Sequence, residues 1–383
     1  MRYFLFPKKD LHSPKGQGAD FIELFFDLVF VYAITRITAD TAHHLDAKHV
    51  MQSVLTFWLI WWGWTQFTWA LNAANTKITG IRMIMLVATG VAFVMASSAD
   101  EAFGDGVLWF ALPYIIIRAI GLLLYSRVTS NLAEHRAAVI SFAIPSMLGL
   151  ATVLCGALAS PEVRVWWWLG TIVLDMVAGY IGGREEGWNL HPAHFAERHG
   201  LIVIIALGES LIVSASAVSA LNMSADLMMA GGLAVVVTCL LWWSYFGWVF
   251  EHMEDHFSKK SGSSQAAAAR DAYSFMHFVL ICGIIGISVG FEIILQHPHD
   301  PLTLPIVSAL AGGHFLFIVF TGLSVWRTSK TVLIPRLVLA ILTLIVVAFT
   351  VGKPPIWALG TISVSLLILV LLEWKKLDGR VHK

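Results

Sequence analysis

Long apolar segments, each able to cross a bilayer, constrain this 383-residue chain more than any other feature of its sequence. Hydrophobic residues make up 57% of it and charged residues only 13%, whereas soluble domains carry about a quarter charged residues. Because lipid cannot hydrogen-bond to the backbone, a spanning segment must be a helix of roughly 20 apolar residues or a strand of a closed barrel. The long uninterrupted runs exclude a barrel and predict an all-α, polytopic membrane protein.

The apolar runs predict twelve membrane-spanning helices. The expected spans are residues 21–38, 50–71, 81–98, 107–126, 138–159, 165–182, 200–219, 228–250, 274–295, 304–326, 332–351 and 355–373.

The distribution of lysine and arginine predicts the orientation, because basic loops are retained on the cytoplasmic side during insertion. Twenty of the 25 basic residues lie in the two terminal tails and in alternate loops, Arg198 among them, and four lie in the opposite loops. The first residues lack the apolar core and cleavage site of a signal peptide, so they are expected to remain as a cytoplasmic tail. We predict a bacterial inner-membrane protein with both termini in the cytoplasm.

The second half of the sequence repeats features of the first half in the same order, which predicts an internal repeat of residues 1–190 and 191–383. The segment LFFDLVF aligns with ALGESLI, which places Asp27 opposite Glu209. The segment WLIWWGWTQFTW aligns with CLLWWSYFGWVF, and LGTI occurs in both halves. With six spans each, the halves would be related by a pseudo-twofold axis along the membrane normal, as in some transporters.

Ionisable residues inside the predicted spans are the first candidates for a functional site. A charge near the bilayer centre costs about 2.5 to 3.5 kcal/mol on insertion scales, so it must face protein or water and usually has a partner. Asp27, Asp175 and Glu209 lie in spans together with one arginine, Arg118. We predict an ion-paired layer in which at least one carboxylate remains free to hold a proton or a cation.

Each of these residues also has a structural interpretation, which stays open beside the functional one. Glu23 shares a helix face with Asp27 but lies at the helix start, where a cap or an interfacial residue is expected. Asp27 and Glu209 are either functional groups or hydrogen-bonding groups that join helices. Arg118 is either a static counter-ion or a binder of a substrate anion.

Histidines supply the second set of candidates. His277, near a cytoplasmic end, and central His314 titrate near neutrality, so they are interpreted either as proton relays or as hydrogen-bonding partners of a neighbour. The loop HPAHFAERH offers metal-ligand types in His191, His194 and Glu197. Its spacing fits no strict zinc motif, and its proline disturbs a shared helical face. We therefore predict no cofactor and no metal, with these three residues as the minor alternative.

Composition bounds the remaining functions. Basic and acidic residues balance at 25 each, so no basic surplus points to nucleic acid. The longest polar segment, residues 251–273, is expected to be a loop, which leaves no room for a separate catalytic domain. The 16 tryptophans are expected to lie mostly near span ends as an aromatic belt.

Four motifs resemble the bacterial low temperature requirement A family of integral membrane proteins. They are ELFFDLVFVYAITRI (residues 23–37), WWGWTQFTWALN (61–72), ERHGLIVIIALGESLI (197–212), and WWSYF (242–246) followed by YSFMHFVLICGIIGISVG (273–290). The resemblance extends over nearly the whole chain and identifies no substrate. The positions that the family pattern singles out are Glu23, Asp27, Asn72, Glu197, Arg198, Gly208, Glu209 and His277.

Three functional hypotheses follow. The preferred one is a secondary transporter or translocator of a small solute or lipid-like molecule, coupled to protons through Asp27, Glu209 and Arg118. The second is a membrane-embedded enzyme acting on lipid or isoprenoid, with Glu197 and His277 at the cytoplasmic surface. The third is a non-catalytic scaffold or sensor of membrane state. The expected partners are membrane lipids and a small solute, lipid or proton, while the enzyme class and the oligomeric state stay open.

Overall fold

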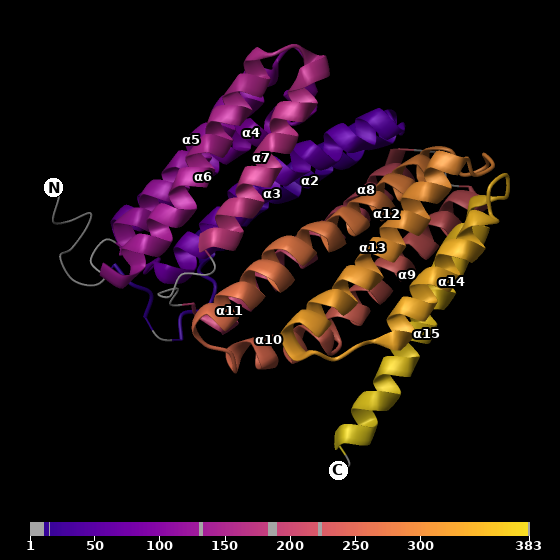
Figure 1. The fold of residues 1–383 in the computed structure, drawn as a ribbon. Coiled ribbons are helices and arrows are strands. Elements are labelled where there is room, and N and C mark those ends of the chain that lie inside the picture. Colours follow the sequence, from indigo (N-terminus) through magenta and orange to yellow (C-terminus); the bar gives the residue numbers. More distant parts are fainter. Residues whose placement is uncertain (1–10, 15, 130–132, 183–189, 221–223, 382–383) are drawn as a thin grey trace. The chain divides into compact units, whose positions relative to one another are not determined.

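The computed structural model describes residues 11–14, 16–129, 133–182, 190–220 and 224–381, and regular structure within these ranges is helical. Apart from an isolated bridge between His12 and Ala74, the described ranges contain no strand, which confirms the all-α prediction. Every predicted span corresponds to a helix (Figure 1): α2 (Phe21–His43), α3 (Ala47–Ala73), α4 (Thr79–Ser97), α5 (Val107–Thr129), α6 (Ala133–Leu158), α7 (Pro161–Gly182), α8 (Pro192–Ala220), α9 (Ala225–Phe246), α12 (Met276–Gln296), α13 (Leu304–Ser329), α14 (Ile334–Ala348) and α15 (Pro355–Val381).

Residues 251–273 do not form the expected polar loop. They contain most of α10 (Val249–Ser258), then α11 (Gly262–Ala268) and most of a π-helix, η2 (Ala269–Phe275), which runs directly into α12. Val249, Met253 and Phe257 recur every four residues along α10 and are buried. This apolar stripe at helical spacing, with the alanine run of α11, explains why helix replaces loop.

Within the described ranges, nine helical stretches are long and apolar enough to cross a membrane. The apolar helix α14 is shorter. Helices α2 and α3 are not among the nine, because α2 is interrupted by charged residues such as Glu23, Asp27 and Arg36, and α3 mixes tryptophan with polar residues. The chain is therefore a polytopic helical protein suited to a membrane.

Side-chain directions on α14 fit a lipid environment. Val338, Ile341 and Ile345 are exposed, whereas Arg336 and Thr343 on the same helix are buried. A helix in water shows the reverse arrangement, with its apolar stripe inside. Polar groups that face inward and aliphatic groups that face outward are expected when hydrocarbon is the solvent.

The helices form two compact units, each described here by itself. The first contains Met1–Ile37, Val50–Ile202 and Phe257–Ser274. In it α4 packs beside α5, α5 beside α6, and α6 closely against α7 (Figure 1). Gly156 of α6 permits this last contact, because a Cβ atom there would lie 2.7 Å from the Trp168 indole of α7.

The second unit contains Thr38–His49, Val203–His256 and Phe275–Lys383. Its main contacts join α12 to α13, α13 to α14, and α15 to both α9 and α14. Helices α12 and α13 touch through their backbones, since a Cβ atom at Gly283 would lie 2.6 Å from the Gly313 carbonyl oxygen. Such small-residue contacts are a common way for membrane helices to pack without a hydrophobic driving force.

Candidate functional site

Helix α8 begins inside the segment that was expected to be a histidine-rich loop. Pro192 occupies the first position of α8, where its missing N–H costs nothing and its φ angle suits a helix. Arg198 therefore lies almost two turns into α8 with a fully buried side chain, and its assignment to a loop was wrong.

Arg198 holds two carboxylates of the first unit at once. Glu23 and Asp27 are four residues apart on α2, so both face the same way. The Arg198 guanidinium donates through Nη1 to Glu23 Oε1 at 2.5 Å and through Nη2 to Asp27 Oδ1 at 2.7 Å. All three side chains are buried. The structure thus pairs Asp27 with Arg198, where the sequence analysis had expected Arg118.

Helix α3 adds a further donor to this cluster. The Trp64 indole N–H donates to Asp27 Oδ1 at 2.7 Å, so one oxygen of Asp27 accepts two hydrogen bonds. The other oxygen, Oδ2, is buried and has no hydrogen-bond partner among the described residues. The Glu23 carboxylate also accepts the backbone N–H of Asp20 at 2.9 Å, which is the capping contact that was expected, and its side chain is fully buried.

Asn72 fixes the state of the His194 ring. The His191 backbone orients the Asn72 amide, because the His191 N–H donates to Asn72 Oδ1 at 2.8 Å and the His191 carbonyl accepts from Nδ2 at 3.0 Å. The same Nδ2 faces His194 Nδ1 at 3.2 Å, so Nδ1 acts as the acceptor. His194 Nε2 then carries the hydrogen and donates to Glu23, 3.1 Å from each oxygen. An acceptor at Nδ1 and a donor at Nε2 together form the hydrogen-bond pattern of a neutral imidazole ring.

An aromatic wall lies beside the cluster. The His199 ring packs edge-on against Trp64 with a centroid distance of 5.1 Å and against Tyr273 at 5.3 Å. Phe195 lies 4.6 Å from His199, and the Arg198 guanidinium lies 5.7 Å from the Trp64 ring centre. These buried rings keep water from that side of the charges and so strengthen their interactions.

Arg118 and Asp175 form a second buried ion pair in the first unit. Arg118 of α5 donates to Asp175 Oδ1 of α7 from both terminal nitrogens, at 3.1 and 3.2 Å. It also donates to the Tyr114 hydroxyl at 2.7 Å, and Trp58 donates weakly to Asp175 Oδ2 at 3.4 Å. One cation and one anion are balanced here, so the expected layer of three carboxylates around Arg118 is replaced by a single pair.

The second unit holds the remaining candidates. Glu209 is buried on α8 next to Ser210, whose hydroxyl lies 2.6 Å from that of Ser288 on α12. His277 Nε2 lies 2.7 Å from the Tyr245 hydroxyl, the partnered arrangement expected of a buried histidine. His314 is also buried, and neither ring nitrogen has a hydrogen-bond partner within the described ranges.

The second unit also contains an ion pair that the sequence analysis did not anticipate. Arg336 of α14 donates to both oxygens of Glu373 of α15, at 2.7 and 2.8 Å, and to the Ser244 carbonyl of α9. The Trp248 indole donates to the same carboxylate at 2.8 Å. Arg336 was counted with the basic loop residues and was not singled out as a candidate, so its buried position became visible only in the fold.

Three carboxylates thus share one arrangement, in which each accepts from an arginine and from an indole N–H. The indoles that bind Asp27 and Asp175 come from the middle of α3, where Trp58, Trp61 and Trp64 are buried. Trp166, Trp242 and Trp243 are exposed, as a belt requires. The belt interpretation therefore fails for α3, whose tryptophans act as hydrogen-bond donors inside the protein.

His194 and Glu197, two of the three candidate metal ligands, make hydrogen bonds to other protein groups. His194 contacts Glu23 and Asn72, while Glu197 Oε2 accepts the Ala19 N–H at 2.9 Å. Partial burial lowers the pKa of His191, which lies just before α8. In the part of the chain that the structure describes, no three histidine, cysteine or carboxylate side chains meet as a metal site.

Comparison with known proteins identifies relatives but no known activity. The model of the family described as bacterial low temperature requirement A protein matches residues 18–371. An uncharacterized protein of Rhizobium meliloti (strain 1021), RA0937, is 26% identical over 327 residues, which cover 82% of this chain and 78% of the relative. No solved structure matches.

Proposed function

Because the chain belongs to the bacterial low temperature requirement A family, we propose that it is a membrane translocator of a small solute or lipid-like molecule, coupled to protons through Asp27. The observation that carries this proposal is the imbalance of charge around Arg198. Two buried carboxylates face one guanidinium, and the neighbouring histidine is held neutral by Asn72. With both carboxylates ionised the cluster would carry one uncompensated negative charge.

Burial makes that uncompensated charge expensive, because a lone ion away from water costs several kcal/mol. One bound proton neutralises the cluster. Asp27 Oδ2 suits this proton, since it is buried and accepts no hydrogen bond from a described residue. Glu23 suits it less, because its two oxygens already accept from Arg198, His194 and Asp20.

Coupling follows from the sharing of one arginine. When Asp27 releases its proton, two anions compete for the same guanidinium, and the balance of contacts on Arg198 must change. Arg198 lies on α8 and the carboxylates on α2, so a shift in that balance favours a different packing of the two helices. A solute that binds one packing better than the other would then be linked to the proton.

The sequence led us to expect that Asp27, Glu209 and Arg118 together couple transport to protons, and the structure changes this hypothesis. Arg118 has its own carboxylate in Asp175 and is assigned to holding α5 against α7. Glu209 remains a candidate proton site, because the sequence repeat places it opposite Asp27. The two-half architecture, residues 1–190 and 191–383, is part of the proposal, as are the inner-membrane location and the cytoplasmic termini.

The scaffold hypothesis is the second candidate, and it has its own support. The Arg118–Asp175 and Arg336–Glu373 pairs each join different helices with a balanced charge, as a purely structural role requires. The enzyme hypothesis has no comparable observation, since Glu197 is engaged with the backbone of Ala19.

Growth of a deletion strain at low temperature tests the translocator proposal. Asp27→Asn keeps the shape of the neutral acid but cannot exchange the proton, so we expect normal protein levels in the membrane and loss of cold growth. The matched control is Asp105→Asn, which changes an exposed carboxylate of the same unit. Cold growth of the Asp27→Asn strain equal to that of the parent would rule out the proposed coupling and favour the scaffold.

A further inference from the structure

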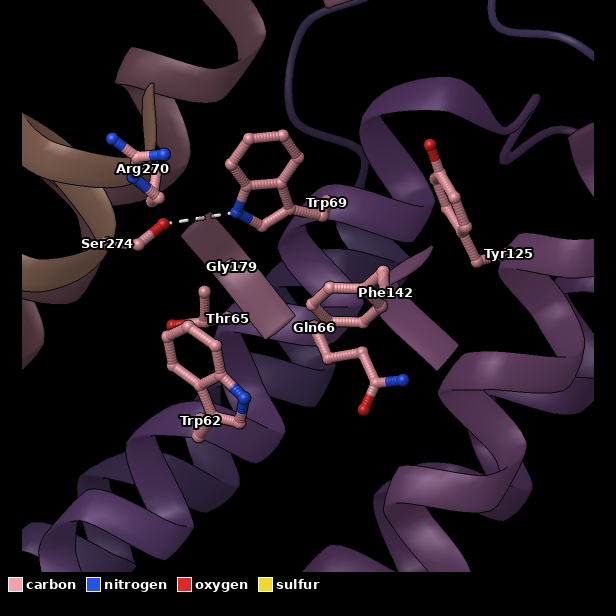
Figure 2. Close-up of a pocket in the computed structure, with 9 residues that line it drawn as sticks. All are labelled: Trp62, Thr65, Gln66, Trp69, Tyr125, Phe142, Gly179, Arg270 and Ser274. Carbon is pink, nitrogen blue, oxygen red and sulfur yellow. Dashed lines mark hydrogen bonds between the residues drawn. The ribbon is translucent and has the colours of Figure 1, made fainter. Parts of the chain in front are cut away.

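A hollow in the first unit lies apart from the charge cluster and takes no part in the proposed coupling. Its space not filled by atoms is about 540 Å³, a figure that includes the solvent at its open mouth. Nine residues from α3, α5, α6, α7 and η2 line it: Trp62, Thr65, Gln66, Trp69, Tyr125, Phe142, Gly179, Arg270 and Ser274 (Figure 2).

The π-helix η2 places two polar residues at this hollow. A π-turn widens a helix and is frequently found at functional sites. Here it carries Arg270 and Ser274, and the Ser274 hydroxyl accepts the Trp69 indole N–H at 3.1 Å. The Ser274 carbonyl accepts the Trp61 N–H at 2.8 Å, so η2 is held firmly against α3.

Arg270, at the edge of the hollow, has hydrogen-bond donors that no described residue uses. Its Nε donates to Asp271 at 2.6 Å, and the guanidinium lies 5.2 Å from the Tyr180 ring centre. The terminal nitrogens Nη1 and Nη2 make no hydrogen bond to any described residue, although the side chain is only 11% exposed. A planar pair of N–H groups held in this way matches a carboxylate or a phosphate.

Gln66 and Thr65 supply further unused groups on α3. Both amide atoms of Gln66 and the Thr65 hydroxyl are buried and have no hydrogen-bond partner among the described residues. Helix α5 approaches Gln66 closely at Gly121, where a Cβ atom would lie 3.1 Å from the Gln66 amide carbon. Buried polar groups without partners are costly, so they indicate a missing partner that carries a carbonyl or a hydroxyl.

Aromatic rings form the rest of the wall. Figure 2 shows Arg270 and Ser274 on one side of the hollow, with Phe142 and Tyr125 on the opposite side. Trp62 and Trp69 lie along α3 between these two sides. A ligand that fits must therefore be acidic at one end, able to hydrogen-bond in its middle and apolar at the other end.

We infer that this hollow binds a single-chain anionic phospholipid, with its phosphate on Arg270, its glycerol ester or hydroxyl at Thr65 and Gln66, and its chain against the rings. Free phosphate would leave the rings and the amide without partners. An uncharged lipid would leave Arg270 unused. The basic loops predict that Arg270 lies near the cytoplasmic headgroups, the depth at which such a lipid presents its phosphate.

The inference goes beyond the coupling site, because binding is measured without transport. The full chain is purified in a mild detergent, and bound lipid is counted by native mass spectrometry. Four probes are compared: lysophosphatidic acid, the monoacylglycerol of the same chain length, the alkyl phosphate of that length, and inorganic phosphate. We expect one lysophosphatidic acid per chain, bound about tenfold more tightly than the monoacylglycerol or the alkyl phosphate, and no detectable binding of inorganic phosphate.

Two variants assign the contacts. Arg270→Gln should remove the preference for lysophosphatidic acid over monoacylglycerol while monoacylglycerol binding stays unchanged, which also shows that the variant is folded. Gln66→Met keeps the side-chain volume and should remove the preference over alkyl phosphate. The control Arg127→Gln removes an exposed arginine of the same unit and should change neither preference.

Each contrary outcome overturns the inference. Equal affinity for lysophosphatidic acid, monoacylglycerol and alkyl phosphate would show that the hollow does not recognise the phosphate. So would an Arg270→Gln variant that still prefers lysophosphatidic acid over monoacylglycerol. An equal loss in Arg127→Gln would indicate attraction to a basic surface only. Tight binding of inorganic phosphate alone would identify a free anion as the ligand. If the Arg270→Gln protein binds no probe at all, Arg270→Lys replaces it, because lysine keeps the charge but lacks the paired donors.

Discussion

The two buried arginines of the first unit differ in the number of acids they serve. Arg118 faces one carboxylate, Asp175, and a neutral tyrosine, while Arg198 faces two carboxylates and a histidine. Both arrangements use an indole N–H from α3. Burial, an arginine and a tryptophan are common to both clusters, and charge balance is the difference on which the proposed proton site at Asp27 depends.

The largest expected effect comes from removal of the arginines. Breaking a buried ion pair costs about 3 to 5 kcal/mol, because the partner is left charged and alone. Arg118→Met should therefore destabilise strongly and be rescued by Asp175→Asn. Arg198→Met should lie at the upper end of this range, and Asp27→Asn should not rescue it, because Glu23 is still unpaired. Thermal unfolding in detergent measures both, and full rescue of Arg198→Met by Asp27→Asn would contradict the comparison.

Replacing Asp175 or Asp27 by asparagine should lower the free energy of unfolding by very different amounts. Asp175→Asn leaves Arg118 as a buried uncompensated cation, so we expect a loss of about 3 kcal/mol or more. In the proposed state Asp27 already carries a proton, so Asp27→Asn should cost less than about 1 kcal/mol. The free energy of unfolding decides the matter, and a larger loss for Asp27→Asn than for Asp175→Asn would reverse the assignment of the two sites.

Asn72 should matter through the His194 ring. Asn72→Ala removes the amide that occupies His194 Nδ1 and leaves the His191 backbone groups unpaired, which should cost about 1 to 3 kcal/mol. The His194 ring is then free to take a second proton. Nuclear magnetic resonance of labelled histidine should show His194 neutral in the parent protein and protonated to a larger extent in the variant. A protonated ring in the parent would remove the need for a proton on Asp27.

The indole donors give the smallest and most graded test. Trp64 donates to Asp27 at 2.7 Å, whereas Trp58 donates to Asp175 at 3.4 Å. Trp64→Phe should cost about 1 to 2 kcal/mol and Trp58→Phe less than about 0.5 kcal/mol beyond the shared loss of ring area. Equal losses in chemical unfolding experiments would show that the indole N–H groups contribute little.

Much of the architecture followed from the sequence, because apolar runs in a bilayer permit few structures. The helices and the absence of strands from the described ranges were predictable from the apolar runs, and the burial of Asp27 and Asp175 from the rarity of charges in the spans. The arginine that pairs with each buried carboxylate could not be predicted from the sequence. Whether Asp27 meets Arg118 or Arg198 depends on how α2, α5 and α8 pack, and no local pattern encodes that.

Arg198 was missed for a local reason. Pro192 was taken to disturb the helix, whereas it starts α8 and carries Arg198 into the interior. The tryptophans of α3 were assigned to a belt because composition cannot distinguish an indole that faces a headgroup from one that donates to a buried acid. The family pattern was the one sequence signal that marked Arg198 together with Glu23 and Asp27.

Infrared difference spectroscopy on the purified protein at neutral pH tests the central claim directly, because protonated and ionised carboxyl groups absorb at different frequencies. The difference between the parent and Asp27→Asn should contain the carbonyl band of one protonated acid, and the difference between the parent and Asp175→Asn only the bands of an ionised carboxylate. If Asp27→Asn instead removes the bands of an ionised carboxylate, Asp27 holds no proton and the Arg198 cluster is a tether like the Arg118 pair.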